Sequence, residues 1–238
     1  MIVNYTEDGW SIITQCSHGM LAAQICSHYK KSLQPTKWVE TLIATANHDD
    51  ANNEFERANL LEGTGGPANF KMDPFDEGFC DYLIHMGMAK SRYVCLLISR
   101  HIQFLYNEDP KAQAYCSDLK TKEKKWLKEA GATKNEIDRS YKLLEFCDAF
   151  SLLICQKLIQ PKGRKIEISE GPEGKSYEMV SGPNDQLIVS PWPFETDSFA
   201  VNYEERKINQ LTFTDNEEFK SAFFKAPVEQ VEVIISKN

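Results

Sequence analysis

The periodicity of the chain changes near Pro161, and this change constrains the fold more than any other feature of the sequence. Before Pro161, apolar residues recur at the three- and four-residue intervals of amphipathic helices. After it, short β-rich segments are separated by glycine and proline. Residues 2–14 are an exception, because they read as a hairpin that turns at Asp8-Gly9.

We therefore predict an α+β fold with a mainly helical core, an N-terminal hairpin and a small antiparallel β C-terminal region. The core is expected in residues 1–160, and the small β-rich region, packed on it, in residues 161–238. Helices are expected at 17–33, 36–48, 77–88, 91–107, 110–130, 134–159 and 215–224. Strands are expected at 164–169, 175–180, 186–190, 198–205 and 230–236. A long loop, rich in glycine and proline, is expected at 57–76.

Charge and cysteine usage narrow the class of protein. The net charge of −8 argues against a broad basic surface for nucleic acid or anionic lipid. No signal peptide and no apolar run long enough to span a membrane is evident. Seven cysteines without a Cys-x-x-Cys pair are typical of reduced thiols and disfavour zinc-ribbon and thioredoxin sites. We expect a cytoplasmic protein that binds neither nucleic acid nor a membrane; a homodimer is left open.

Ligand-type side chains lie on the apolar stripes of four predicted helices, where polar groups are unusual. The stripes are His18 with Leu21, Ala22 and Ile25; Asp49 with Val39, Leu42 and Ala46; His101 with Val94, Leu97, Ile98 and Leu105; and Asp148 with Ile137, Tyr141, Leu144, Ser151, Cys155 and Leu158. His48 adjoins Asp49. A buried ionised carboxylate needs a cation, and no lysine or arginine stands on these stripes. A divalent metal would satisfy the aspartates and imidazoles together, and the alternative for each residue is a hydrogen-bonded core role.

These residues resemble the ligand pattern of the HD superfamily of metal-dependent phosphohydrolases. In that family, one histidine is followed by an adjacent His-Asp pair and then by a distant aspartate on a final helix. His18, the pair His48-Asp49, and Asp148 match this pattern, with gaps of thirty and ninety-nine residues. The resemblance implies an HD-like helical core and a metal held by these four residues.

Dinuclear members of the superfamily, including the inositol oxygenase-like di-iron oxygenases, carry two further histidines before the last aspartate. His85 and His101 fall in that interval and are the candidates for those two ligands. The resemblance therefore leaves open one or two ions, which would be a divalent transition metal: Mn, Fe, Co, Ni or Zn.

The whole chain also resembles an uncharacterised bacterial HD-like family. The shared segments are Ile13-Thr14-Gln15, His48-Asp49-Asp50, Ser99-Arg100-His101 and Pro191-Trp192-Pro193-Phe194. In that family Gly-Trp commonly follows His-Asp-Asp, whereas this chain has Ala51-Asn52. This resemblance gives no substrate.

Hydrolysis would need further groups around the metal. Asp50 and Glu56 are candidates for the catalytic acid or base, and their alternative is a helix end with exposed acids. Arg100 and Lys71 are candidates for binding a substrate phosphate. Three hypotheses follow: a metal-dependent hydrolase of a phosphorylated small molecule, a phosphomonoester or phosphodiester; a di-iron oxygenase; and a non-catalytic binding or structural protein.

Overall fold

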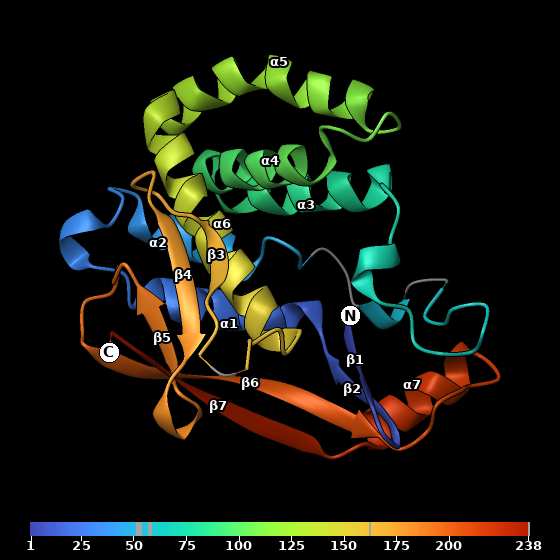
Figure 1. Ribbon diagram of the computed structural model, residues 1–238. Coiled ribbons are helices and arrows are strands. Elements are labelled where there is room, and N and C mark those ends of the chain that lie inside the picture. The colour runs from blue at the N-terminus through green and yellow to red at the C-terminus, as the bar shows by residue number, and fades with distance from the viewer. Residues whose placement is uncertain (51–53, 57–58, 162, 238) are drawn as a thin grey trace.

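The computed structural model describes residues 1–50, 54–56, 59–161 and 163–237, and these ranges contain seven α-helices and seven strands (Figure 1). The helices are α1 (Gln15–Ser27), α2 (Trp38–Ala46), α3 (Glu77–Lys90), α4 (Arg92–Tyr106), α5 (Gln113–Ala130), α6 (Lys134–Cys155) and α7 (Asn216–Lys225). The strands are β1 (Ile2–Thr6), β2 (Gly9–Ile13), β3 (Ile166–Glu170), β4 (Ser176–Ser181), β5 (Leu187–Ser190), β6 (Ser198–Ile208) and β7 (Val228–Ser236).

All seven of these strands form one mixed sheet in the order β1-β2-β6-β7-β5-β4-β3. The N-terminal hairpin joins the C-terminal strands, because β2 pairs antiparallel with β6 through Trp10↔Ile208. β5 and β7 run parallel, and the other neighbours run antiparallel. The predicted fold class, a mainly helical core with a small antiparallel C-terminal β region, was therefore wrong. The sheet is a major layer that takes strands from both ends of the chain.

Helices α1 to α6 cover one side of this sheet in layers, and α7 lies apart from them beside β6 (Figure 1). Helices α1 and α6 contact each other, and α6 also packs on β3 while α1 packs on β6. Their shared core contains large buried side chains such as Phe146, Phe150 and Phe194. A second buried cluster lies among α2 to α6, and it includes Trp126 and Leu97. The candidate ligands lie on α1, α4 and α6 and directly after α2, so this packing decides whether they meet.

Local capping sets several helix ends. The start of α1 and the end of α2, both close to candidate ligands, differ from the predicted bounds. Helix α1 begins at Gln15, because the Thr14 side chain accepts a hydrogen bond from the Ser17 N–H and caps it. Helix α2 ends at Ala46, so the pair His48-Asp49 lies in a turn rather than in a helix. Helix α6 starts with a capping box between Thr133 and Glu136.

The outer members of three predicted stripes are exposed. Val39, Leu105 and Leu158 keep 63%, 48% and 41% of their surface accessible, so the stripes are narrower than predicted. All seven cysteines are free, and six of them are buried. None of the described helices combines the length and apolarity that crossing a bilayer requires.

Gly19 allows α1 to approach the end of α2 closely. A Cβ at position 19 would stand 2.5 Å from the Ala46 carbonyl oxygen, which is a backbone atom and cannot rotate away. We expect Gly19→Ala to lower the free energy of unfolding by about 1–3 kcal/mol, because the two helices must separate. Urea denaturation measures this. Gly63→Ala is the control, since nothing lies within 4 Å of its added Cβ; equal stabilities of the two variants would contradict the close approach.

Candidate metal centre

Five of the six predicted ligands come together from four separate segments of the chain. His18 lies on α1, the pair His48-Asp49 follows α2, and Asp148 lies on α6. The fourth segment is α4, which contributes His101. His18 and His48 are fully buried, and Asp148 is nearly so, whereas Asp49 is partly exposed. The packing of the helices therefore creates one polar cluster inside an apolar surrounding.

Three ligand atoms form a nearly equilateral triangle at the centre of this cluster. The His18 Nε2 and His48 Nε2 atoms are 3.2 Å apart, and each lies 3.1 Å from the Asp148 Oδ1 atom. The Asp49 Oδ2 atom completes the group at 3.6 Å from His48 Nε2 and 4.0 Å from His18 Nε2. All four atoms thus face a common point.

Hydrogen bonds on the far side of each imidazole fix which nitrogen faces that point. His48 donates its Nδ1–H to the Thr45 carbonyl oxygen at 2.7 Å. The Ser151 hydroxyl donates to the Asp148 carbonyl oxygen at 2.9 Å, so it must accept from the His18 Nδ1–H, also at 2.9 Å. In their neutral forms both imidazoles therefore direct an Nε2 lone pair at the common point. Two lone pairs and two carboxylate oxygens repel one another unless a proton or a metal ion lies between them.

The protonation equilibria reflect this crowding. Burial opposes the charged form of His48, but the charges of Asp49 and Asp148 raise its pKa from 6.5 to about 9. Burial likewise opposes ionisation of Asp49, yet His48 and His101 lower its pKa to about 2. The pKa of Asp148 also lies well below its usual value, because His48 and His18 outweigh the burial. Without a metal, a proton on His48 offsets part of the negative charge of the two carboxylates.

The geometry fits a divalent transition metal. Metal–nitrogen and metal–oxygen bonds of about 2.1 Å, at angles of 90–109°, place neighbouring ligand atoms about 3.0–3.4 Å apart. The edges of the triangle, 3.1 and 3.2 Å, fall in this range. Two groups of three residues could hold an ion with ligand atoms within 4.8 Å of one another, and they share His48: His18, His48 and Asp49; His48, His101 and Asp148. Two imidazoles with two carboxylates suit Mn, Fe, Co, Ni or Zn.

Two residues hold the Asp49 carboxylate in place. The His101 Nε2 atom lies 3.3 Å from Asp49 Oδ1, and the Gln15 Nε2 atom donates to Asp49 Oδ2 at 3.3 Å. The His101 Nδ1 atom is buried and has no hydrogen-bond partner in the described part of the chain. His101 is thus close enough to act as a ligand or to orient Asp49.

A pocket of about 680 Å³ opens beside the cluster. Asp49, His101 and Asp148 contribute to its inner wall, together with Gln15. The other described lining residues are Glu56, Asn59, Phe70, Lys71, Asp73, Pro74, Asp76, Phe79, Leu105, Tyr106 and Leu152. A more open hollow of about 830 Å³ is lined by residues 61–65 and 213–217 and includes none of the predicted ligands. A small molecule in the first pocket would therefore contact the candidate metal centre.

The structure separates the remaining predicted site residues into two groups. Glu56 and Lys71 line the pocket, as a catalytic acid or base and a phosphate-binding cation would. Asp50 is not among the lining residues; its carboxylate accepts hydrogen bonds from the Cys16 thiol and the Asn47 amide. Its geometry supports a role in holding the turn that carries His48 and Asp49. Ala51 and Asn52 lie outside the described residues.

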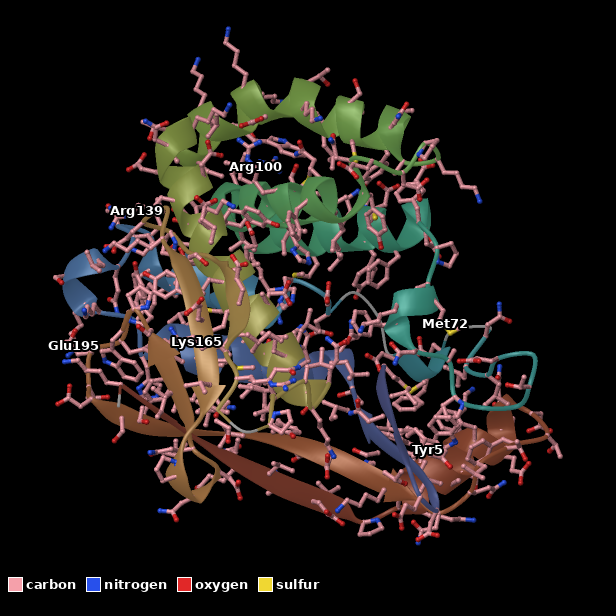
Figure 2. All side chains as sticks on the ribbon, in the orientation of Figure 1. Tyr5, Met72, Arg100, Arg139, Lys165 and Glu195 are labelled. Carbon is pink, nitrogen blue, oxygen red and sulfur yellow. The ribbon has the colours of Figure 1, made fainter. Side chains whose placement is uncertain are left out.

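Arg100 and His85 do not reach the site. Arg100 lies between α4 and α5 (Figure 2), where its guanidinium pairs with Glu123 and, at 2.9 Å, with Asp138. Arg100 thus ties α4 to α5 and α6 and does not line the pocket, so its role as a phosphate ligand stays a prediction without structural support. His85 is exposed on α3 and belongs to neither metal-binding group of the described residues. The structure therefore places His85 apart from the other candidate ligands.

Three residues that bond the candidate ligands could not be recognised as such from the sequence. Ser151 stood on the Asp148 stripe, but it was taken as part of the apolar face rather than as the partner of His18. Gln15 was named only as part of the Ile13-Thr14-Gln15 segment shared with the uncharacterised family, just before the predicted helix at 17–33. The main-chain carbonyl of Thr45 carries no side-chain signal at all. Only Ser151 gave a signal that the sequence could have shown, because it is a polar residue three positions after Asp148 on the same predicted stripe.

Removing the Ser151 hydroxyl leaves the buried Nδ1–H of His18 without its hydrogen-bond acceptor. We expect Ser151→Ala to lower the free energy of unfolding by about 1–3 kcal/mol and to weaken metal binding about 10- to 100-fold. Calorimetric titration with Mn²⁺ measures the affinity. Ser140→Ala is the matched control, because this buried serine on the same helix bonds Tyr93 Oη at 2.7 Å, away from the ligands. Equal metal affinities of the two variants would exclude an orienting role for Ser151.

Comparison with known proteins gives one match. A family model described as "Protein of unknown function (DUF3891)" matches residues 1–210. No curated protein and no solved structure matches the chain.

Proposed function

The chain belongs to the family described as "Protein of unknown function (DUF3891)", and because that description names no activity, we propose a function from the site. We propose a metal-dependent hydrolase of a phosphorylated small molecule, with the metal held by His18, His48, Asp49 and Asp148. The observation that carries this proposal is the triangle of His18 Nε2, His48 Nε2 and Asp148 Oδ1, whose two imidazoles are both oriented by bonds at Nδ1. The order of these ligands along the chain resembles that of the HD superfamily and supports the same chemistry.

The chain's own residues prepare the site for hydrolysis. A bound divalent metal would supply a nucleophilic hydroxide near neutral pH and polarise a phosphoryl oxygen. Thr45 and Ser151 hold the imidazoles in the tautomer that leaves Nε2 free to bind metal. Lys71, on the pocket wall, offers a positive charge to a substrate phosphate, and Glu56 offers a carboxylate that takes or gives a proton.

The site favours one ion over two. The two groups that could hold a metal share His48, so both describe the same position rather than a pair of sites in the described residues. His85, which a second site would need, points to solvent. The di-iron oxygenase hypothesis therefore lacks one of its ligands, and one metal per chain would exclude it.

The hydrolase proposal is tested on protein purified without a His tag. The protein is stripped with a chelator, loaded with Mn²⁺, Co²⁺ or Ni²⁺, and offered a panel of phosphomonoesters and phosphodiesters, nucleotides included. We expect phosphate release that needs the metal and that Asp148→Asn abolishes. Metal-loaded protein that cleaves no ester in the panel would contradict the proposal. A chain that takes up no metal, and whose stability Asp148→Asn leaves unchanged, would instead be a non-catalytic binding or structural protein.

A further inference from the structure

Gln15 combines three features that a purely structural glutamine does not need. It is nearly fully buried at the first turn of α1, it lines the 680 Å³ pocket, and it touches Asp49, a candidate metal ligand. Its main-chain N–H donates to the carboxylate of Glu54, which fixes the start of the helix without using the side chain. The main-chain bond to Glu54 thus anchors Gln15, and the side-chain amide can contact a molecule bound in the pocket.

The orientation of the Gln15 amide follows from its partner. Only the NH₂ end can donate to the Asp49 carboxylate, so the nitrogen faces Asp49 at 3.3 Å and the oxygen faces away. The Oε1 atom is buried and has no hydrogen-bond partner in the described residues. Burying an amide oxygen without a partner reduces stability, so a glutamine here lowers the stability that an apolar residue of the same shape would give.

The remaining N–H of this amide has no hydrogen-bond partner among the described residues, and it belongs to a side chain on the pocket wall. From this geometry we infer that Gln15 contacts the substrate: one N–H holds the metal-facing oxygen of Asp49, and the other donates to an oxygen of the reacting phosphoryl group. This inference rests on the proposed function and names a substrate-contacting residue of the same site. A neutral donor next to the point where negative charge develops stabilises the transition state more than the ground state.

The test compares Gln15→Met with Gln24→Met. Methionine matches glutamine in length and carries no N–H donor. Gln24 is also on α1, but both ends of its amide bond the main chain of Asn202, outside the pocket. At saturating Mn²⁺ we expect Gln15→Met to lower kcat about 100-fold, to change KM less than threefold and to leave the melting temperature unchanged or raised. Gln24→Met should melt at a lower temperature and keep its kcat.

A second readout does not depend on turnover: calorimetric titration of the Mn²⁺-loaded proteins with inorganic phosphate. We expect phosphate to bind wild type and Gln24→Met alike and Gln15→Met about tenfold more weakly. If esters are cleaved but Gln15→Met keeps its kcat and its phosphate affinity, the inference is wrong and hydrolysis stands. If no ester is cleaved but phosphate binding depends on Gln15, hydrolysis is wrong, and Gln15 contacts a bound phosphate rather than a reacting phosphoryl group. Absence of both binding and cleavage contradicts both.

Discussion

Asp148→Asn is expected to bind Mn²⁺ at least about 100-fold more weakly than wild type and to lose all metal-dependent activity. The Oδ1 atom of Asp148 lies 3.1 Å from both imidazole Nε2 atoms, so it is the anionic corner of the triangle. An asparagine keeps the shape but removes the charge that a divalent ion needs. Calorimetric titration of chelator-stripped protein measures the affinity directly.

The same substitution should also destabilise the metal-free protein. Removing one partner of a buried ion pair leaves the other charge uncompensated, which costs about 3–5 kcal/mol. Asp138→Asn is the matched control, because Asp138 is on the same helix, is only half-buried and pairs with Arg100. Wild-type metal affinity in Asp148→Asn, or an equal loss in Asp138→Asn, would remove Asp148 from the ligand set.

The second large effect concerns pH. We expect the difference in stability between metal-loaded and metal-free protein to grow as the pH rises from 6.5 to 9. In the metal-free protein the pKa of His48 is raised to about 9, so its contribution to stability is complete below pH 6.5 and is lost as the pH rises through 9. Asp49 has a pKa lowered to about 2, so its contribution is present above pH 3.8 and is lost as the pH falls through 2. Metal-free protein should therefore be most stable between about pH 4 and 6.5.

A bound metal takes the place of the proton on His48, and its binding should release that proton. The loaded protein should then keep its stability at alkaline pH, where the stripped protein loses about 3 kcal/mol at most. Thermal unfolding between pH 6 and 8.5, with chelator or with Mn²⁺, measures the gap between the two melting temperatures. If the difference between the two melting temperatures stays constant or narrows over this range, no proton competes with the metal. Asp148→Asn should melt at the same temperature with chelator and with Mn²⁺.

The inward direction of the candidate ligands could be predicted because it depends on local periodicity. His18, His101 and Asp148 are each spaced by three or four residues from apolar neighbours, so their inward direction follows from helix geometry alone. The position of His85 could not be predicted because its neighbours on the helix are mixed, and the structure places it on the exposed side of α3. The position of Arg100 could not be predicted because its partners, Glu123 and Asp138, lie on other helices that no local pattern links to it.

The sheet could not be predicted, because its pairings join segments that are far apart in the chain. Trp10 pairs with Ile208. β5 pairs parallel with β7, although β6 and α7 lie between them in the sequence. Alternation along each strand indicates which face is buried, but it does not specify which strand lies beside it. The strands were located well from the sequence, whereas their assembly into one sheet depends on long-range packing against α1 and α6.

Metal content per chain, measured by elemental mass spectrometry on protein purified without a His tag and reloaded with Mn²⁺, tests the central claim most directly. One tightly held ion per wild-type chain, and none in Asp148→Asn, is the result expected from the convergence of His18, His48, Asp49 and Asp148. Wild-type protein that retains no ion after dialysis, or that holds an ion equally well without Asp148, would contradict it.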